Sequence, residues 1–372
     1  MPKPMKRRIL VYPYDRSFCA TIVYQHELLT DTCVNAVLSP NGWGLVGKDA
    51  GYAGDRENTG IQVKSDETFH SELDNADILL IPSGEWSGGI RNRIMSFMLS
   101  ALGKRKAVWC AAVLSDDECQ KIKEACGNDS EFRYLLLEAS NALPAQEPQK
   151  PRKLYRPSAP VVFIAEMVGD SDGYEVLLSL HQRFTSNGYR SSAFCNRADS
   201  MVWGAHMLPD YMNDPQAKPT AIITDFNNYI KQVEKNERPD VILIHLPECL
   251  MKYDDIFTNG YGVLPYILSQ AVQPDYMVAC IPYGEVPEAQ LKKISETCKH
   301  RFGCEIGIFH MSGIHIDYNE SLSKRKMVYD YLSVDDVENK LAQGYTHYSI
   351  PICNVRADNG RMLFANVMSA LG

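Results

Sequence analysis

Residues 161–175 read VVFIAEMVGDSDGYE, an apolar run followed by a polar loop that contains two glycines. The unbroken apolar run is typical of a parallel β-strand that is covered on both faces. An amphipathic stretch from Tyr174 to Asn187 follows and ends at Gly188, which predicts a helix. Strand, glycine-containing loop and helix in this order are the layout of the phosphate-binding unit of P-loop NTPases.

The consensus GxxxxGK[ST] of that unit fits the loop poorly. With Gly173 placed at the second glycine, Val168 takes the position of the first glycine, Tyr174 that of the lysine and Glu175 that of the Mg²⁺-binding hydroxyl. A triphosphate would meet no lysine and several carboxylates, and would be repelled. We therefore expect a degenerate phosphate loop without ATP hydrolysis.

Two interpretations of this loop stay open. It is an ordinary strand-to-helix connection whose acidic residues are favoured by the helix dipole, or it is a repurposed ligand site. In the second case Glu248 belongs to the site, because it follows the apolar run 241–246 by two residues and would emerge at the same sheet edge, like the acid of a Walker B strand. The ligand-binding candidates in the loop itself are Gly169, Asp170, Ser171 and Gly173.

Alternation of short apolar runs with helical patterns predicts an α/β fold with two doubly wound, mostly parallel sheets. The chain of 372 residues exceeds the usual size of one core, which favours two domains. We expect a Rossmann- or flavodoxin-like domain at residues 1–128, a proline-rich linker at 129–159 and the degenerate P-loop-like domain at 160–372.

The expected elements follow the apolar runs and the capping signals. In the first domain, Ser115 with Glu118 predicts the start of a helix that runs to about Ala125. The strands are expected at 8–12, 36–38, 76–82 and 106–112, then at 161–165, 192–195, 241–246, 276–281, 304–310 and 347–351. The later helices are expected at 225–235, 286–301, 334–343 and 359–371.

Residues 39–51 of the first domain, SPNGWGLVGKDAG, form a second candidate site. Loops this rich in glycine are costly in chain entropy and often bind a ligand, but a packed surface loop anchored by its tryptophan is an equal alternative. The turn 82–89, PSGEWSGG, and the turn 12–15 follow strands of the same sheet and are expected at the same edge, where the three loops would line one crevice. The ligand-binding candidates here are Trp43, Gly44 and Lys48.

Composition restricts the classes of function. The formal net charge of −8 and the lack of a long basic run argue against a nucleic-acid or anionic-membrane surface. The apolar run after the basic N-terminus stops at Pro13, too short for a signal or membrane helix, so we expect a cytoplasmic protein.

Eleven cysteines without a CxxC pair predict free thiols. His310 and His315 are the only near pair of histidines. Asp317 could supply the third ligand of a metal site if the segment turned, but most histidines of this kind are merely hydrogen-bonded, and we expect neither a metal nor a cofactor.

Two stretches resemble a known family. Residues 39–50, SPNGWGLVGKDA, and the block 161–212, which ends in MLPDYM, are similar to the peptide maturation system proteins of clostridial bacteriocin-type gene clusters. The resemblance extends over most of the chain and includes RPDVILI at 238–244 and SQAVQPD at 269–275. It implies an accessory role in the maturation of a ribosomally synthesised peptide (RiPP), beside a radical (radical SAM) enzyme, and implies no residue roles.

Three hypotheses of function follow. The first is an accessory protein that binds the precursor peptide or a peptide-modifying enzyme in a crevice between the domains, without ATP hydrolysis. The second is an enzyme of unassigned chemistry acting on the peptide, for which the weak catalytic candidates are Asp15, Lys48, Asp49 and Glu175. The third is a divergent nucleotide-binding regulator. The sequence leaves the oligomeric state open, a homodimer included.

Overall fold

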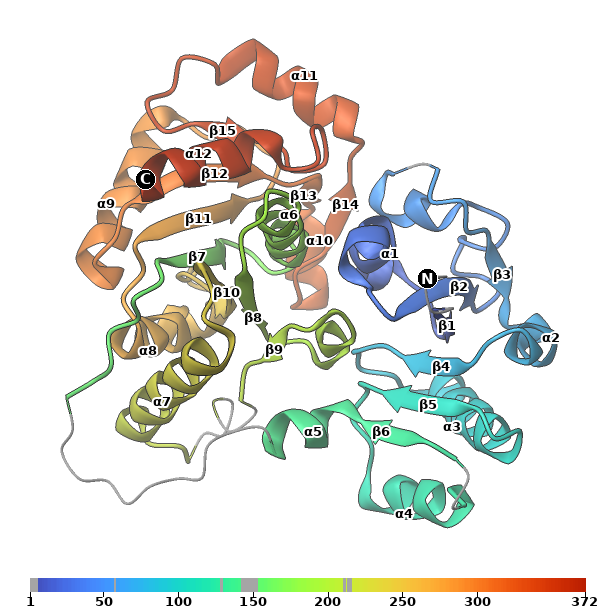
Figure 1. Ribbon diagram of the computed structural model, residues 1–372. Helices are drawn as coiled ribbons and strands as arrows, with labels where there is room; N and C mark the ends of the chain where they lie inside the picture. Colours follow the sequence, from blue (N-terminus) through green and yellow to red (C-terminus); the bar gives the residue numbers. More distant parts are fainter. Residues whose placement is uncertain (1–5, 57, 128–129, 142–152, 210–211, 213–215) are drawn as a thin grey trace. The chain divides into compact units, whose positions relative to one another are not determined.

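The computed structural model describes residues 6–56, 58–127, 130–141, 153–209, 212 and 216–372. They form two compact units, each built on its own sheet (Figure 1). Unit 1 comprises Met1–Ala142 and Arg197–Met207, and unit 2 comprises Leu143–Asn196 and Leu208–Gly372. The α/β class and the two mostly parallel sheets that the sequence predicts are confirmed.

Unit 1 contains a six-stranded sheet of order β3-β2-β1-β4-β5-β6, in which every pairing is parallel. This is the strand order of the Rossmann fold, whose ligands bind where the order reverses, beside β1 and β4. The strands are β1 (Arg7–Val11), β2 (Thr32–Ser39), β3 (Val63–Ser65), β4 (Ile78–Ile81), β5 (Ala107–Cys110) and β6 (Phe132–Tyr134).

Helices cover both faces of this sheet, as the continuous apolar strands require. In β1, Leu10 faces one core together with Leu79 and Val108, whereas Ile9 and Val11 are equally buried on the opposite face. The helices and 3₁₀ turns are α1 (Arg16–Leu28), η1 (Ala50–Gly54), η2 (Asp66–Thr68), α2 (Phe69–Asp74), α3 (Gly88–Gly103), α4 (Asp116–Ala125), α5 (Leu135–Asn141) and η3 (Ala198–Trp203). The predicted capping box of α4, Ser115 with Glu118, is present.

The boundaries of unit 1 differ from the expected range 1–128. Strand β6 and helix α5 complete the sheet beyond residue 128, because β6 pairs in parallel with β5. The part of the expected linker at 142–152 lies outside the described residues. Residues 197–207 also belong to unit 1, although they are separated from it in sequence. Strand β6 and helix α5 are too short to carry a periodic pattern that identifies them from the sequence.

Unit 2 is built on a seven-stranded sheet of order β15-β12-β11-β7-β10-β8-β9, with parallel pairing from β15 to β8; its last strand, β9, belongs to the segment 197–207. The central strand β7 is flanked by β10 and β11, so the Walker-B-like strand pairs directly with the strand before the loop. The strands are β7 (Val161–Glu166), β8 (Ser191–Cys195), β9 (His206–Met207), β10 (Val241–Cys249), β11 (Tyr276–Ile281), β12 (Ile306–Met311) and β15 (Ile352–Cys353); β13 (Ile314–Ile316) and β14 (Tyr329–Tyr331) form an antiparallel hairpin.

The helices of unit 2 agree with the periodic segments of the sequence, apart from short ones. The strand expected at 347–351 is wrong: these residues form a turn and an irregular segment, and only Ile352–Cys353 pairs with β12. The short α8 and α10 and the hairpin were not expected. The helices and 3₁₀ turns are α6 (Gly173–Ser186), α7 (Pro219–Glu237), η5 (Asn259–Gly262), α8 (Val263–Ala271), α9 (Glu288–Phe302), α10 (Tyr318–Lys324), α11 (Val334–Gly344) and α12 (Arg361–Leu371).

The core of unit 2 explains the apolar run 161–165. Val161, Phe163 and Ala165 face one cluster of buried side chains, and the intervening Val162 and Ile164 are buried on the other face. A strand covered on both faces cannot place a polar side chain until it leaves the core. The first polar position is Glu166, where β7 ends and the loop begins.

Candidate functional site

The loop between β7 and α6 encloses a carboxyl group of the protein itself. Glu166, the last residue of β7, turns its side chain to the start of α6, where its Oε1 accepts the backbone N–H of Gly173 at 2.8 Å. The first N–H groups of a helix lack partners within the helix and attract anions, which is why P-loops bind phosphate there. In this chain an intramolecular carboxyl occupies that position.

Burial raises the pKa of Glu166 to about 8. The hydrogen bond from Gly173 opposes the shift, and the nearby carboxylates of Asp170 and Asp172 add to it. The Nε2 atom of His245, on β10, lies 4.0 Å from Glu166 Oε2. A carboxyl that titrates near neutral pH beside an imidazole has the chemistry of a general acid or base.

Position 173 has room only for a glycine, because two side chains lie close to its Cα atom. A Cβ atom there would lie 2.4 Å from His245 Nε2 and 2.9 Å from Glu166 Oε1. Both distances are shorter than a van der Waals contact, so no side chain fits at this position without displacing His245 and Glu166. The glycine that the sequence places at the second consensus position therefore makes room for Glu166 and His245.

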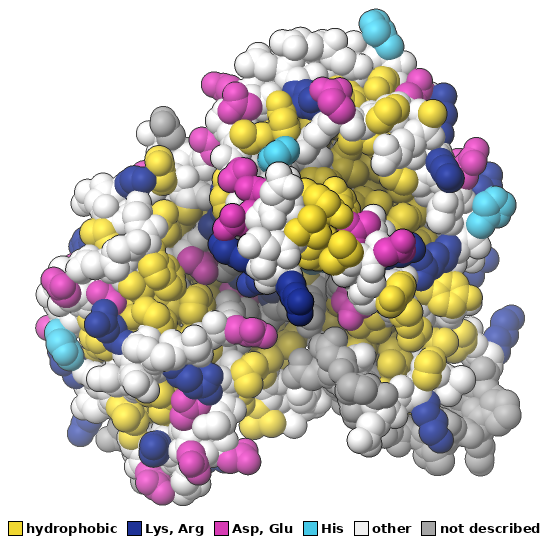
Figure 2. Space-filling model, turned by 180° about the vertical axis from the view of Figure 1, so that it is seen from behind, with side chains coloured by type: hydrophobic (Ala, Val, Ile, Leu, Met, Phe, Trp, Pro, Cys, Tyr) yellow, Lys and Arg dark blue, Asp and Glu magenta, His cyan; other side chains and the backbone are white. Residues whose placement is uncertain are grey.

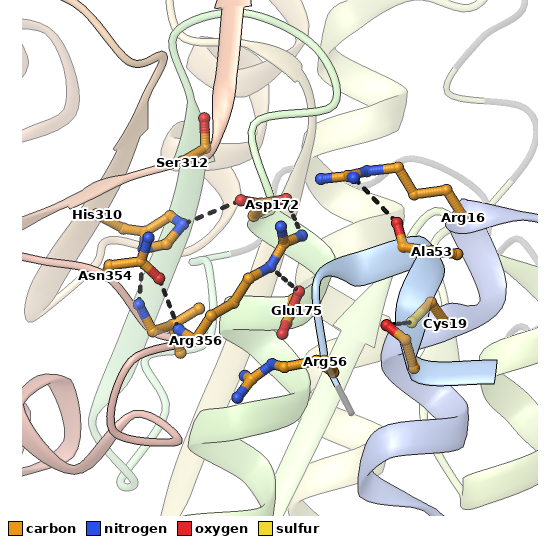
Figure 3. A network of polar contacts seen from close by, with 12 residues as sticks. Arg16, Cys19, Ala53, Arg56, Asp172, Glu175, His310, Ser312, Asn354 and Arg356 are labelled. Carbon is orange, nitrogen blue, oxygen red and sulfur yellow. Dashed lines mark hydrogen bonds and ion pairs between the residues drawn. The ribbon is translucent and has the colours of Figure 1, made fainter. Parts of the chain in front are cut away.

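Beneath the loop lies a buried network of charged side chains, shown in Figure 3. Arg356, which follows β15, donates from Nη2 to Asp172 Oδ1 at 2.6 Å and from Nε to Glu175 Oε2 at 2.8 Å. The side chains of all three residues are almost completely buried. The guanidinium thus neutralises carboxylates of the loop and of the first turn of α6, and holds them in fixed positions.

His310, on β12, extends this network in one defined tautomer. Its Nδ1 accepts the backbone N–H of Val355 at 3.1 Å, so the proton of the neutral ring is on Nε2. That Nε2 atom lies 3.4 Å from Asp172 Oδ2 and donates to it (Figure 3). Asp172 consequently receives hydrogen bonds from both His310 and Arg356, which orient it although its backbone is left-handed, with φ of 67°.

The other candidates of the loop have different positions. Ser171 is buried, and its hydroxyl donates to the carbonyl of Val168 at 2.7 Å. Asp170 is exposed, with φ of 63°, and among the described residues no cation pairs with it. Gly169 lies next to Tyr329 of β14: a Cβ on Gly169 would be 3.9 Å from the phenol oxygen. Burial, and then the charge of Asp170, raise the pKa of Tyr329.

Glu248 lies at the carboxyl edge that the sequence predicts. It is in an irregularity of β10, where the register shifts so that Cys249 pairs with Glu166. Its backbone is left-handed, with φ of 61°, and its side chain packs against Gly260, where a Cβ would lie 2.5 Å from Oε2. Burial against this turn raises the pKa of Glu248. No described residue forms an ion pair or hydrogen bond with its carboxyl group, which leaves an acidic group at the rim of the site.

In unit 1 the structure brings the two glycine-rich turns together, as expected. The rings of Trp43 and Trp86 stack, with centroids 6.1 Å apart and planes 22° apart. Gly44, with φ of 73°, belongs to the same turn. Lys48 places its ammonium group 3.6 Å from the centre of the Tyr52 ring. The loop is thus anchored by aromatic contacts of its own.

The weak catalytic candidates of unit 1 hold backbone in place. Asp49 caps η1 and accepts from the N–H of Gly51 at 2.7 Å and the hydroxyl of Thr59 at 2.8 Å. Burial raises its pKa, but these hydrogen bonds outweigh that effect, and the net pKa is lowered. Asp15 caps α1 and accepts from the N–H of Ser17 at 2.9 Å. Glu175, the candidate of unit 2, is the buried partner of Arg356.

The Rossmann edge of unit 1 is covered by residues 197–207. The fully buried carboxylate of Asp199 accepts from the backbone N–H and the hydroxyl of Ser83, which follows β4, at 3.3 and 3.1 Å. Arg197 pairs with Asp199 at 2.7 Å and donates to the carbonyl of Ser17 at the start of α1 at 3.0 Å. The segment binds beside β4 and α1, where Rossmann proteins bind dinucleotides.

Sequence reasoning missed several residues that shape these sites: Glu166, His245, His310, Tyr329, Arg356 and Asp199. Glu166 carries a local signal, since it ends a buried parallel strand, and ligands of α/β sheets bind at the carboxyl ends of such strands. Arg356 and Asp199 carry none, because their partners lie 181 and 116 residues away. His310 and His315, the near pair of the sequence, do not share a site: His310 is buried, and the exposed His315 lies 3.9 Å from Asp330.

The described residues contain no group of three or more His, Cys, Asp or Glu side chains arranged to hold a metal ion. None of their helices combines the length and the apolar character that crossing a bilayer requires. The eleven cysteines are all free thiols, as expected.

Comparison with known proteins identifies the fold. No family model matches the chain, and no curated protein matches it. Among solved structures it is similar to the crystal structure of a DUF1611 family protein from Anabaena variabilis, with a TM-score of 0.60 and 12% sequence identity. The match covers 98% of this chain and 100% of that chain. At this identity the similarity shows a shared fold and carries no residue roles.

Proposed function

We propose that the chain is a peptide-binding accessory protein that works without nucleotide hydrolysis. The observation that carries this proposal is the hydrogen bond from Gly173 to Glu166, because it places a carboxyl of the protein where a phosphate would bind. The sequence resemblance to peptide maturation system proteins supports the peptide as the ligand. The partner is the precursor of a ribosomally made peptide or the enzyme that modifies it.

The charges around the loop favour this function over nucleotide binding. A P-loop supplies a lysine and a hydroxyl for the phosphates and the magnesium ion. Here those positions hold Tyr174 and Glu175, and the guanidinium of Arg356 is bonded to two carboxylates. Asp170 and Glu248 add negative charge at the rim, where they would attract a basic side chain and repel a phosphate.

The test is binding by the intact protein. Isothermal titration against the short peptides and the modifying enzymes encoded beside its gene should yield at least one complex, and ATP, ADP and GTP should produce no heat and no shift of the melting temperature. Failure of every such peptide and enzyme to bind would refute the proposal. Binding or hydrolysis of a nucleotide would instead favour the regulator that the sequence left open.

A second function is favoured by a specific observation, the contact between Glu166 and His245. A carboxyl whose pKa is near 8, placed 4.0 Å from an imidazole, is suited to proton transfer. The chain would then act on the peptide as an acid–base enzyme. If so, Glu166→Gln abolishes product formation but leaves peptide affinity intact. If the chain is an accessory protein, the variant keeps both, and this difference separates the two functions.

A further inference from the structure

Exposed aromatic and aliphatic side chains gather beside the loop of unit 2. Ile256 and Tyr261 are 60% and 59% exposed, although large apolar side chains are normally buried. Exposed hydrophobic side chains, with carboxylates among them, are visible on the face shown in Figure 2. The aromatic surface is defined here as Tyr253, Ile256, Tyr261, Tyr318 and Leu322.

Hydrogen bonds hold this surface in one conformation. The Oδ1 atom of Asp254 accepts the backbone N–H groups of Ile256 and Phe257 at 2.7 and 2.6 Å, and its Oδ2 accepts the hydroxyl of Tyr318 at 2.8 Å. The rings of Phe257 and Tyr318 meet edge to face, with centroids 6.2 Å apart. One carboxylate therefore joins the turn at 253–257 to the start of α10, and a prearranged surface loses little entropy when it binds.

Tyr261 is exposed at a cost in backbone energy. It has φ of 57° between two glycines that also have positive φ, a conformation that a bulky residue adopts rarely. Arg301 maintains this turn by donating to the carbonyls of Tyr261 and Gly262 at 2.9 and 2.7 Å. Strain of this kind is concentrated at functional sites. The turn presents the aromatic side chain of Tyr261 to solvent.

The aromatic surface adjoins the acidic rim of the site. Gly260, next to Tyr261, packs against the carboxyl of Glu248, and the side chain of Asn259 donates to the carbonyl of Met167 at 3.4 Å. The cations nearest in sequence have partners, since Lys252 pairs with Asp255 and Lys324 with Glu320. The exposed Arg325 and Lys326 lie beyond Leu322, at the far end of α10. The end beside Glu248 therefore combines apolar side chains with one carboxylate, and the guanidinium of Arg301 at the same turn is bonded to the backbone carbonyls of Leu250, Tyr261 and Gly262.

We propose that the aromatic surface binds an extended peptide segment through its aromatic or aliphatic side chains, with an adjacent arginine or lysine paired to Glu248. Apolar side chains of the peptide cover Ile256 and Tyr261, which gives affinity, and the ion pair gives direction and charge selectivity. This inference rests on the proposed function and names the kind of peptide that the site takes.

The experiment uses fluorescence anisotropy with three labelled synthetic peptides of equal length. The first alternates phenylalanine, leucine and glycine around one central arginine, the second has glutamate in place of arginine, and the third has serine in place of every apolar residue. Wild-type protein should bind the first about tenfold more tightly than either of the others. Equal affinity for the three peptides, or no binding of the first, overturns the inference.

Variants of the aromatic surface and of Glu248 test where the first peptide binds. Ile256→Ser combined with Tyr261→Ser should weaken the first peptide about tenfold, and Glu248→Gln should abolish the preference for arginine over glutamate. Tyr189→Ser, which removes an equally apolar side chain exposed elsewhere in unit 2, should change neither. Circular dichroism and thermal melts establish that each variant is folded.

Further outcomes separate this inference from the proposed function. If the precursor peptide or modifying enzyme binds wild type and the double variant equally, the function stands and the aromatic surface is not its site. If none of these partners binds wild type, the proposed function itself fails. Light scattering that shows a dimer in wild type and a monomer in the double variant would assign the surface to a second copy of the chain, and loss of vesicle binding in that variant would assign it to a membrane. Either result overturns the inference.

Discussion

Glu166 and Gly173 are joined by a hydrogen bond of 2.8 Å between the carboxyl of one and the backbone N–H of the other. The bond closes the loop on itself at the N-terminus of α6. An anion that approached this helix would have to displace a side chain that is anchored by the strand before it. The loop retains the geometry of a phosphate cradle, while its binding position is occupied from within the chain.

The first prediction concerns the pH dependence of stability. The pKa of Glu166 is raised from 4.5 to about 8 in the folded state, so between these pH values the folded protein holds a proton that the unfolded chain has released. Stability from this group is complete below pH 4.5 and declines as pH rises to about 8, by at most about 1.4 kcal/mol per pH unit. Glu166→Gln should remove this slope.

Urea denaturation from pH 5 to pH 9 measures this dependence of stability on pH. The difference in free energy of unfolding between wild type and Glu166→Gln should move in favour of the variant as pH rises, and should stay constant above about pH 8. Glu27→Gln, which removes an exposed carboxylate of unit 1, is the control for the loss of one charge. A difference that does not vary with pH would contradict the protonated state of Glu166.

The second prediction concerns the space around Gly173. Gly173→Ala inserts a methyl group between His245 and Glu166, and we expect a loss of about 1–3 kcal/mol in the free energy of unfolding. Gly89→Ala is the matched control, since it lies in the first turn of α3 with no atom within 4 Å of its Cβ position. That variant should be neutral or stabilised by about 0.5–1 kcal/mol. Equal effects of the two substitutions would contradict the close packing of Gly173.

The third prediction concerns the buried network. Arg356→Met leaves Asp172 and Glu175 buried without their cation, which should destabilise the protein by about 3–5 kcal/mol. Combining Arg356→Met with Glu175→Gln should recover part of this loss, because one of the two uncompensated charges is removed. Thermal and chemical denaturation of wild type, the two single variants Arg356→Met and Glu175→Gln, and the double variant gives the coupling between the residues.

An exposed ion pair supplies the control for the network. Arg190 and Asp240 lie 3.2 Å apart with both side chains largely in solvent. Arg190→Ala should therefore stay within experimental error of wild type. If Arg356→Met were as mild as Arg190→Ala, the network would not be the rigid base of the loop.

The fourth prediction concerns the turns of unit 1. The stacked rings of Trp43 and Trp86 should produce an exciton couplet in the circular dichroism spectrum, and either Trp43→Phe or Trp86→Phe should abolish it. Trp109→Phe is the control, because Trp109 contacts Arg7 and Arg133. A couplet that survives the replacement of Trp43 would show that the two turns do not meet.

Individual elements show which parts of the fold the sequence pattern predicted correctly. The apolar run before Glu166 predicted β7, and Ser115 with Glu118 predicted the start of α4, because burial on both faces and helix capping are properties of neighbouring residues. The stretch 347–351 was misjudged because a short apolar run does not distinguish a strand from a buried turn. The end of unit 1 was misjudged for a similar reason, because β6 has only three residues and gives no recognisable strand pattern.

The amino-acid pattern was enough to establish the α/β class, the two sheets, the degenerate loop and the edge at which Glu248 emerges, since each depends on periodicity or on residues close together in the chain. Folding in three dimensions decided the contents of the sites. It brought Arg356 to Glu175 across 181 residues and Asp199 to Ser83 across 116. It also turned the side chain of Glu166 to the N-terminus of α6, where desolvation raises its pKa. Such pairings depend on how the sheets and helices pack, and no local pattern encodes them.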